Sequence, residues 1–534
     1  MNKWLSGEVV LQRENLLDQM KDVAVFDVVV IGGGASGLGI ALEAVLRGYR
    51  TLLVEQADFA KGTSSRSTKL VHGGVRYLEQ GDIRMVRKAN IERGLLSRNA
   101  PHLVKNQTFL IPLYSYWDRL KYVAGLKFYD WIAGKWSLGP SLFVSRKKTL
   151  EYLPGIKTKG LIGGVLYHDG QFDDSRLAIN LMQSIQEGGG IAINYIKVKE
   201  LLKEDGKIAG VVAEDTESRQ SYRVRSKAVI NATGVFADGI LKMDDAGSPK
   251  SICVSQGVHL VLDRKFYSSD HALMIPHTSD GRVLFAIPWH DKVVVGTTDT
   301  PVEQASLEPK ALEKEIDFIL GTASQYLTLQ PRRPDVLSVF AGLRPLAAPK
   351  EGGQKTKEIS RSHKILVSRS HLFSIIGGKW TTYRKMGEDM IDRVEKELGW
   401  PATPSVSASF SIHGYIQSAR EGDPFGFYGS DAVYLKEAAY ANDTAGGWID
   451  RSIGLHRVQV IWAIRKELAR SVEDVLARRT RVLFTDARRA MEVAPAVAGI
   501  MAGEMGKDAA WQKRQVEDFV RVAYNYLLEP NRPE

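Results

Sequence analysis

Cysteine is almost absent from this sequence: Cys253 is the single cysteine among 534 residues. One thiol cannot form an intramolecular disulfide, and it cannot supply the four thiolates of an iron–sulfur cluster. The C-terminal region also lacks a calcium-loop pattern, so we expect no bound metal. A single free thiol fits a protein that works in a reducing compartment.

Long apolar runs are missing as well. No stretch reaches the roughly 18 consecutive apolar residues that a transmembrane helix requires. The first 22 residues contain polar side chains too often to form the apolar core of an export signal. We therefore expect a cytoplasmic protein, and peripheral contact with the inner face of the cell membrane stays open.

The sequence has no concentrated basic tract, although Lys and Arg (72) outnumber Asp and Glu (62). This excess predicts a surface that attracts anions such as phosphorylated metabolites and lipid head groups. A nucleic-acid-binding protein would gather these charges in an arm or stripe, so we expect no nucleic-acid partner. A chain of 534 residues exceeds the size of one core and should form two or three domains.

A nucleotide-binding motif lies near the start of the chain. Residues 23–31 form an apolar, β-branched run that is typical of a buried parallel strand, and the turn GGGASG leads from it into a helical stretch. In this turn Gly32 permits the tight bend, Gly34 lets the backbone approach a pyrophosphate, and Gly37 allows close packing of helix on strand.

An acidic residue follows at the spacing of a dinucleotide site. Residues 49–54 predict a second strand, and Glu55 comes directly after it, about 20 residues beyond Gly32. An acid at this place binds a ribose and repels the 2′-phosphate of NADP. The unit therefore predicts FAD or NAD.

Two later segments repeat the pattern of strand and glycine turn. Residues 227–234 (KAVINATG) predict a buried strand that ends in small residues, and Leu372–Ile376 leads into Gly377, Gly378 and a helix at about 381–398. The N-terminus of that helix could stabilise negative charge on a flavin ring. Together these junctions favour a large cofactor, FAD, over NAD.

Residues 63–79 (TSSRSTKLVHGGVRYLE) resemble the signature of FAD-dependent glycerol-3-phosphate dehydrogenases. Further blocks of that family keep their order over residues 25–395. They are DDSRL (173–177), NATG (231–234), IPW (287–289), GTTDT (296–300), GLRPL (342–346) and GGKWTTYRK (377–385). The resemblance implies oxidation of sn-glycerol 3-phosphate to dihydroxyacetone phosphate, with hydride transfer from C2 to flavin N5.

The resemblance does not fix the electron acceptor, and our leading hypothesis is that the reduced flavin passes its electrons to membrane quinone. Two alternatives stay open. Glycerol-3-phosphate oxidases share these blocks and pass electrons to oxygen, and an amino-acid or hydroxy-acid oxidase of the same fold would bind a carboxylate in place of phosphate. A homodimer is also left open.

The substrate presents a phosphate dianion and two hydroxyls, which require cationic donors and a proton acceptor. The resemblance implies that the substrate-binding residues are Arg76, Tyr77, Arg344, Arg361, Lys379 and Thr381. The implied catalytic residues are His259, Lys379 and Arg344. His259 is the first candidate for the base and Lys379 the second, although a histidine in an apolar strand is often a core residue. Arg361 matches only as an arginine before a strand, and a solvated surface arginine is its alternative.

We expect FAD to be bound non-covalently. The predicted cofactor-binding residues combine the glycine turns, the ribose acid and the hydroxyl-rich block. They are Gly32, Gly34, Ser36, Gly37, Glu55, Thr63, Ser64, Ser65, Thr68, His72, Gly73, Gly74, Gly234, Gly378 and Thr381. For the hydroxyl-rich block, the capped start of a helix is the alternative.

The predicted fold class is α/β, with a FAD-binding Rossmann-like domain of the glutathione-reductase and D-amino-acid-oxidase type. This domain is discontinuous, with residues 22–90, 165–235 and 343–400. A substrate-binding cap domain on an antiparallel sheet takes residues 91–164 and 236–342. Residues 403–534 form a C-terminal α-helical domain, because apolar residues recur there at helical spacing.

Aromatic and basic residues are concentrated between residues 109 and 148, with ten aromatic and seven basic side chains. Such a mixture can anchor a protein at an anionic bilayer and bring it close to quinone. A contact between domains or subunits is the alternative.

Overall fold

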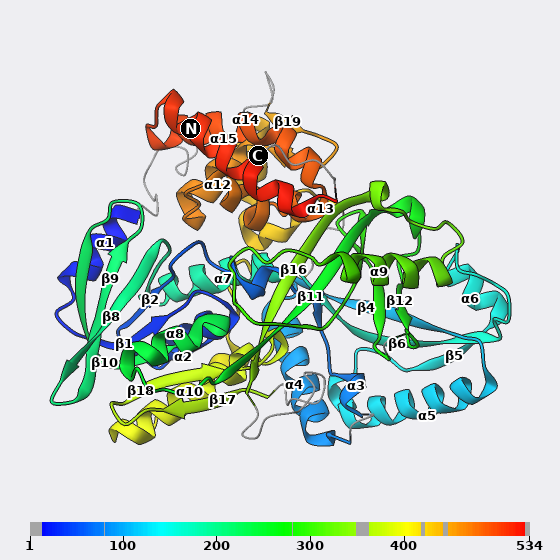
Figure 1. Cartoon of the computed structure of the whole chain (residues 1–534), viewed down its shortest axis with the longest axis horizontal. Helices are drawn as coiled ribbons and strands as arrows, with labels where there is room; N and C mark the ends of the chain where they lie inside the picture. Colours follow the sequence, from blue (N-terminus) through cyan, green and yellow to red (C-terminus); the bar gives the residue numbers. More distant parts are fainter. Residues whose placement is uncertain are drawn as a thin grey trace.

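The computed structural model describes residues 13–78, 81–279, 281–348, 362–417, 422–441 and 447–528. Figure 1 shows two β-sheets side by side, with the C-terminal helices above them. The cavity described below lies between the two sheets, so their topology decides which side chains meet in it.

The first sheet has the strand order β17-β18-β10-β1-β2-β7. From β18 to β7 all neighbours are parallel, and β17 is antiparallel to β18. Its strands are β1 (Phe26–Ile31), β2 (Thr51–Val54), β7 (Ile191–Ile193), β10 (Ser221–Asn231), β17 (Lys364–Val367) and β18 (Leu372–Ile376), and the hairpin of β8 (Ile196–Glu204) and β9 (Lys207–Asp215) extends from β10. Val28, Val29 and Val30 are all fully buried, as expected for a strand in the interior of a parallel sheet.

Three helices bury the apolar residues of this sheet. They are α2 (Ala35–Leu46), α7 (Asp174–Glu187) and α10 (Tyr383–Leu398), and α2 contacts both of the others. α10 ends at Gly399, which adopts the left-handed conformation of a helix C-cap. The sequence predicted α2 and α10, the helices that follow the two glycine turns, and it made no prediction for α7.

The second sheet has the strand order β15-β11-β14-β13-β12-β4-β6-β3, with β16 beside β11 and β5 beside β6. Among the described strands, β12 pairs in parallel with β4, and the other neighbours are antiparallel. The strands are β3 (Leu70–Val71), β4 (Val104–Leu113), β5 (Leu142–Ser145), β6 (Gly163–Phe172), β11 (Ile252–Asp263), β12 (Ala272–Ile275), β13 (Leu284–Trp289), β14 (Lys292–Gly296), β15 (Thr300–Val302) and β16 (Val336–Ala347). β6 belongs to this sheet, whereas the sequence assigned residues from 165 onward to the first domain. The predicted domain boundaries stay predictions.

The C-terminal region is helical. Its main helices are α11 (Ala432–Ala441), α12 (Arg457–Glu467), a π-helical turn (Asp474–Arg479), α13 (Val482–Thr485), α14 (Ala487–Met505) and α15 (Ala509–Ala523), and the short antiparallel strands β19 (Trp448–Asp450) and β20 (Leu455–His456) precede α12. Its apolar core is continuous with one face of the second sheet, because Phe484 and Val497 belong to the same buried cluster as Val261, Trp289 and Phe340. The region is therefore packed directly on the strands that carry the site.

Within the described ranges, no helix is long and apolar enough to cross a bilayer. The same ranges contain no group of three or more histidine, cysteine or acidic side chains placed to hold a metal ion. Cys253 is half-buried and is not part of a disulfide.

Candidate functional site

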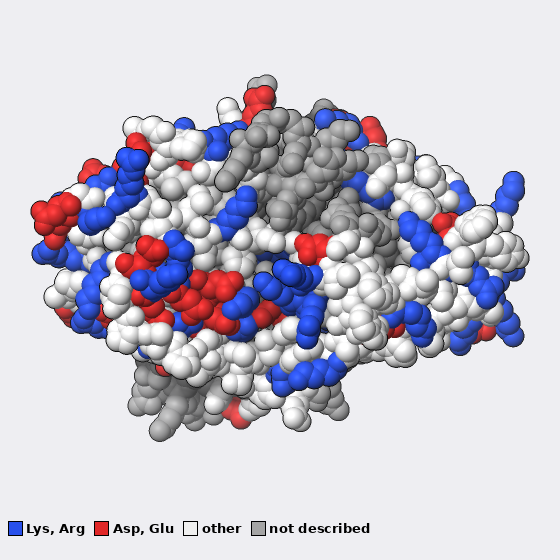
Figure 2. Space-filling model, turned by 90° about the horizontal axis from the view of Figure 1, so that it is seen from below, with Lys and Arg blue, Asp and Glu red and all other residues white. Residues whose placement is uncertain are grey.

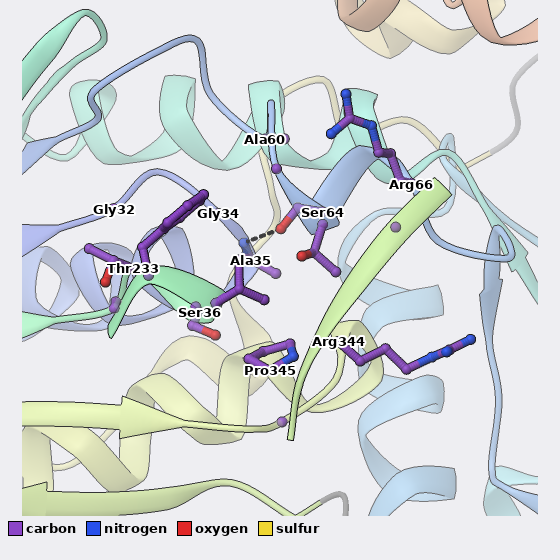
Figure 3. Close-up of a pocket in the computed structure, with 18 of the residues that line it drawn as sticks. Gly32, Gly34, Ala35, Ser36, Ala60, Ser64, Arg66, Thr233, Arg344 and Pro345 are labelled. Atoms are coloured by element: carbon purple, nitrogen blue, oxygen red, sulfur yellow. Dashed lines mark hydrogen bonds between the residues drawn. The ribbon is translucent and has the colours of Figure 1, made fainter. Parts of the chain in front are cut away.

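A cavity of about 620 Å³ lies where the carboxyl ends of the first sheet's parallel strands meet β11 and β16 of the second sheet. Ligands bind at this edge of open α/β sheets because the glycine turns and helix N-termini gather there. Figure 3 shows that Gly32 and Gly34 lie at one end of the cavity and Arg344 at the other. The cavity therefore joins the nucleotide motif to the predicted substrate residues.

The glycine turn after β1 leaves no room for side chains at two of its positions. Gly32 has a φ of +112°, and a Cβ added to it would lie 2.7 Å from the carbonyl oxygen of Ala232. A Cβ on Gly37 would lie 1.8 Å from the carbonyl oxygen of Gly32. Because these positions carry no side chain, the backbone of the turn packs closely. The N-terminus of α2 then lies at the cavity, where Gly34 is the N-cap. A helix N-terminus in this position favours a bound anion.

The hydroxyl-rich block contacts this helix N-terminus through Ser64. The backbone N–H of Ala35 donates a hydrogen bond to Ser64 Oγ at 2.9 Å, which Figure 3 marks. The indole Nε1 of Trp380 donates to the carbonyl oxygen of Ser64 at 2.8 Å. Ser64 therefore links the start of α2 to the turn after β18.

Glu55 lies at the end of β2 with its carboxylate directed to backbone donors. Gly33 N donates to Oε2 at 2.7 Å, and Ala57 N donates to Oε1 at 2.9 Å. Burial raises the pKa of Glu55 above its ordinary value, while these backbone donors oppose that change. Glu55 also lines the cavity, as a ribose-binding acid should.

His259 points from β11 into the other end of the cavity. His259 is 2% exposed, and its ring stacks on Phe340 with 4.9 Å between ring centroids. Nε2 shares a hydrogen bond of 2.9 Å with Thr68 Oγ1. Burial, followed by the positive charges of Arg344 and Lys69, holds the pKa of His259 well below its ordinary value. His259 is therefore neutral at physiological pH and has the capacity to accept a proton.

Arg344 lies on β16 beside β11. Nη1 is 3.3 Å from Asp299 Oδ1, and Nη2 donates to the carbonyl oxygen of Thr298 at 3.0 Å. A Cβ on Gly257 would lie 2.3 Å from Nη2, so this glycine provides the space for the guanidinium. A partly buried guanidinium needs an anionic partner, and Asp299 is one such partner within the chain itself.

Lys379 follows the glycine turn after β18. Its Nζ lies 3.3 Å from Met85 Sδ, and Lys379 precedes a 3₁₀ turn that contains the buried Thr381. Lys379 and Thr381 line the same cavity as His259 and Arg344. Segments that are far apart in the sequence therefore meet at one site.

The structure brings most of the predicted site residues together. Those that line the cavity are Gly32, Gly34, Ser36, Glu55, Thr63, Ser64, Thr68, His72, Gly234, His259, Arg344, Gly378, Lys379 and Thr381. Those near it but outside its lining are Gly37, Ser65, Gly73 and Gly74. Arg76 and Tyr77 lie in α3 (Val75–Leu78), but their side chains, like all of Arg361, fall outside the described residues.

Several residues of the site received no role from the sequence, among them Arg66, Thr233, Asp299 and Trp380. Arg66, Thr233 and Trp380 line the cavity, and Asp299 contacts Arg344. Each lies inside a block that resembles a known family. The family blocks were therefore a sequence signal for these four residues. Their contacts are made with other segments of the chain, however, and the sequence of a block does not show them.

Residues 27–384 match the family described as FAD dependent oxidoreductase, and residues 373–512 match the C-terminal domain of alpha-glycerophosphate oxidase. The chain is 35% identical over 560 residues to the protein named glycerol-3-phosphate dehydrogenase, mitochondrial, from Bos taurus. That similarity covers 98% of this chain and 76% of the bovine protein.

Solved structures show the same likeness. The glycerol-3-phosphate dehydrogenase from Bacillus halodurans complexed with FAD has a TM-score of 0.79 at 30% identity, covering 98% of this chain and 100% of that one. L-alpha-glycerophosphate oxidase from Mycoplasma pneumoniae with FAD bound has a TM-score of 0.57 at 17% identity, covering 73% of this chain and 99% of that one. The second likeness shows the fold alone.

Proposed function

The chain belongs to the family of FAD-dependent glycerol-3-phosphate dehydrogenases, and from this premise we propose its reaction. The enzyme oxidises sn-glycerol 3-phosphate to dihydroxyacetone phosphate and passes the electrons to membrane quinone. The family and the fold class predicted from the sequence are confirmed, and FAD is the cofactor. One observation supports the proposed substrate most: His259, Arg344 and Lys379 line the cavity that begins at the glycine turn.

The residues of the cavity fit FAD. The N-terminus of α2, with Gly34 and Ser36 in the cavity wall, offers backbone donors and a positive dipole to a pyrophosphate. Glu55 offers carboxylate oxygens to a ribose. A volume of about 620 Å³ falls within the usual range of cofactor sites.

FAD supplies an acceptor, N5 of its isoalloxazine ring, for the hydride that leaves C2 of the substrate. The residues of the chain have two proposed tasks. Arg344 and Lys379 bind the phosphate dianion through charge-assisted hydrogen bonds. His259, which is neutral because its pKa is held low, accepts the proton that leaves the C2 hydroxyl. Arg76, Tyr77 and Arg361 stay proposed substrate contacts on the resemblance alone.

Spectroscopy of the purified holoenzyme tests this proposal. Anaerobic addition of glycerol 3-phosphate is expected to bleach the flavin absorbance. Reoxidation of the reduced enzyme that is faster with a short-chain quinone than with oxygen would support the dehydrogenase, and the reverse, with formation of peroxide, would identify an oxidase. An unchanged flavin band would contradict the proposed substrate, and bleaching by an amino acid in its place would identify the remaining alternative.

Replacing Glu55 with alanine is expected to weaken FAD binding by about 10- to 150-fold, because a hydrogen bond to a charged group contributes about 1.5–3 kcal/mol. The ratio of flavin to protein absorbance after dialysis measures the effect. Glu200→Ala, a change at an exposed glutamate on β8, is the matched control. Equal flavin occupancy in the two variants would remove Glu55 from the ribose site.

A surface helix supports the proposed contact with the membrane. α5 (Tyr116–Ala133) packs against the protein through Tyr122, Leu126 and Tyr129. Its opposite side bears an apolar stripe at helical spacing, in which Trp117 is 81% exposed and Trp131 is 75% exposed. The stripe consists of Trp117, Leu120, Ala124, Phe128 and Trp131.

Basic side chains flank this stripe, which favours an anionic bilayer over a protein partner. Arg119, Lys121, Lys127 and Lys135 are exposed. Figure 2, seen from below, shows acidic residues mainly on the left, whereas the side that carries α5 in Figure 1 shows basic residues among uncharged ones. Exposed tryptophans with basic neighbours are typical of helices that lie in the head-group layer. We therefore propose that α5 places the enzyme where quinone is dissolved.

Replacing Trp117 and Trp131 together with serine is expected to abolish binding to vesicles that contain phosphatidylglycerol, because the helix loses its largest apolar contacts. Cosedimentation measures binding, and turnover with a soluble dye should be retained. Tyr440→Ser on α11, at a residue that is 80% exposed, is the control. Unchanged sedimentation combined with loss of a dimer would assign α5 to a subunit interface.

A further inference from the structure

The C-terminal helices contact one wall of the cofactor cavity at several points. Residues 56–69, the flavin loop, connect β2 to β3. Its members in the cavity wall include Lys61, Thr63, Ser64, Arg66 and Thr68. We propose that the helical region 447–528 holds the flavin loop in its FAD-binding conformation. This inference rests on the FAD site proposed above and assigns a task to a region that the sequence described only as helical.

The first anchor is the carboxylate of Asp58, which is fully buried. Arg479 donates to it through Nη2 at 2.9 Å and also through Nη1, and Arg478 donates through Nε. Burial alone would raise the pKa of Asp58, but the two arginines lower the pKa to about 2. Both arginines belong to the π-helical turn Asp474–Arg479, and such turns are frequent at functional sites.

The second anchor joins Lys61 to the same turn. Lys61 Nζ donates to Glu473 Oε2 at 2.6 Å, and Arg478 Nη1 donates to Glu473 Oε1 at 2.8 Å. The side chains of Lys61 and Glu473 are 18% and 12% exposed. Because water and salt reach this pair poorly, their attraction is screened little.

The third and fourth anchors lie nearer the substrate end. Arg66 Nη2 donates to Tyr526 Oη at 3.0 Å. The ammonium of Lys69 lies 5.0 Å from the ring centroid of Phe484, against which the ring of Tyr526 packs edge-on at 5.6 Å. Lys69 is also 5.2 Å from the ring of Phe340, on which His259 stacks. The C-terminal contacts therefore reach from the ribose end of the cavity to the proposed base.

These anchors matter because the flavin loop has little regular structure of its own. Within it the structure shows one 3₁₀ turn, Thr63–Ser65. Fixing such a loop costs conformational entropy, and a loop that is ordered only when the ligand binds lowers the affinity. Contacts from the C-terminal helices order the loop during folding, so FAD meets a site that is already formed.

Two mild substitutions test the proposal, because the cations beside Glu473 keep other carboxylates: Arg478 still pairs with Asp58 and Asp474, and Lys61 lies 3.6 Å from Glu308. Tyr526→Phe keeps the ring and removes the hydroxyl that accepts from Arg66, and Glu473→Gln removes the charge opposite Lys61. Each is expected to raise the Kd of the apoprotein for FAD about tenfold, and both together about a hundredfold. The kcat at saturating FAD should stay close to that of the wild type. Quenching of FAD fluorescence measures the Kd.

Limited proteolysis of the apoprotein gives a second readout. Trypsin is expected to cut the double variant after Lys61, Arg66 or Lys69 sooner than the wild type, and mass spectrometry locates the cuts. General destabilisation would instead speed cleavage throughout the chain. Tyr524→Phe in the same turn as Tyr526, and Glu517→Gln at an exposed glutamate of α15, are the matched controls.

Three results would overturn the proposal: an unchanged Kd in the folded double variant, an equal rise in the controls, or a flavin loop that is cut no sooner than other segments. If the double variant does not fold, the single variant Tyr526→Phe still decides the question, because phenylalanine preserves the packing of the ring. A wild-type protein that binds FAD but does not oxidise glycerol 3-phosphate would count against the proposed function and leave the anchoring proposal standing.

Discussion

Replacing His259 with glutamine is expected to lower kcat by about 10²- to 10⁴-fold, the usual contribution of a general base. Glutamine retains a side chain that can hydrogen-bond to Thr68 Oγ1, which lies 2.9 Å from the imidazole, but it cannot take up a proton. FAD should stay bound. The rate of anaerobic flavin bleaching in a stopped-flow instrument measures this step without contributions from the electron acceptor.

The environment of His259 also predicts the pH dependence of the reaction. The ordinary pKa of a histidine is about 6.5, and burial, Arg344 and Lys69 hold the pKa of His259 well below that value. In the free enzyme the imidazole therefore stays neutral at pH 6.5 and becomes protonated only at lower pH. The acid limb of kcat/KM should therefore lie below pH 6.5. A bound phosphate dianion offsets the charge of Arg344 and raises the pKa of His259, so the acid limb of kcat should lie at higher pH than that of kcat/KM.

Two results would contradict this role for His259. One is a variant that bleaches at the wild-type rate, and the other is an acid limb that persists in His259→Gln. His277→Gln is the matched control, because the side chain of His277 is 58% exposed and His277 is not in the cavity wall. If Lys379 were the base in place of His259, the limb would disappear in a Lys379 variant instead.

The nucleotide half of the fold could be predicted because its determinants are local. The predicted strand Leu372–Ile376 has the same bounds as β18, and β1, the glycine turn and α2 follow in the predicted order. Steric exclusion explains the glycines, since a Cβ on Gly37 would lie 1.8 Å from a backbone oxygen. Alternation and glycine sterics act within a few residues, and a sequence displays them directly.

The pairing of distant segments could not be predicted. β6 is buried along most of its length, so its apolar pattern does not indicate which sheet it joins. Lys69 is fully buried, and its Nζ forms an ion pair with Asp174 Oδ1 at 2.8 Å. The ammonium also lies among the rings of Trp289, Phe340 and Phe484. These partners come from widely separated parts of the chain, and a lysine in a basic, hydroxyl-rich block gives no sign that it will be buried among them.

The resemblance implies that Arg344 binds the substrate, and the structure places Asp299 beside its guanidinium. Replacing Arg344 with alanine is expected to raise the KM for glycerol 3-phosphate by about 10- to 150-fold, since a charge-assisted hydrogen bond contributes about 1.5–3 kcal/mol. Arg344→Lys should fall between alanine and wild type, because lysine keeps the charge and loses the forked geometry. Arg333→Ala, at a side chain that is 37% exposed, is the control.

Asp299 makes the single variant ambiguous. It is 6% exposed and lies 3.3 Å from Arg344 Nη1, so Arg344→Ala removes a positive charge that faces this carboxylate in the protein interior, where Ser255 Oγ also donates to it. Loss of one partner from a buried pair destabilises a protein by about 3–5 kcal/mol, and the resulting distortion could itself raise KM. The double variant Arg344→Ala, Asp299→Asn removes the negative charge as well. If its KM stays as high as that of the single variant while its Tm recovers, the guanidinium binds the substrate phosphate. If KM returns to the wild-type value, Arg344 serves to neutralise Asp299, and another cation of the cavity must hold the phosphate.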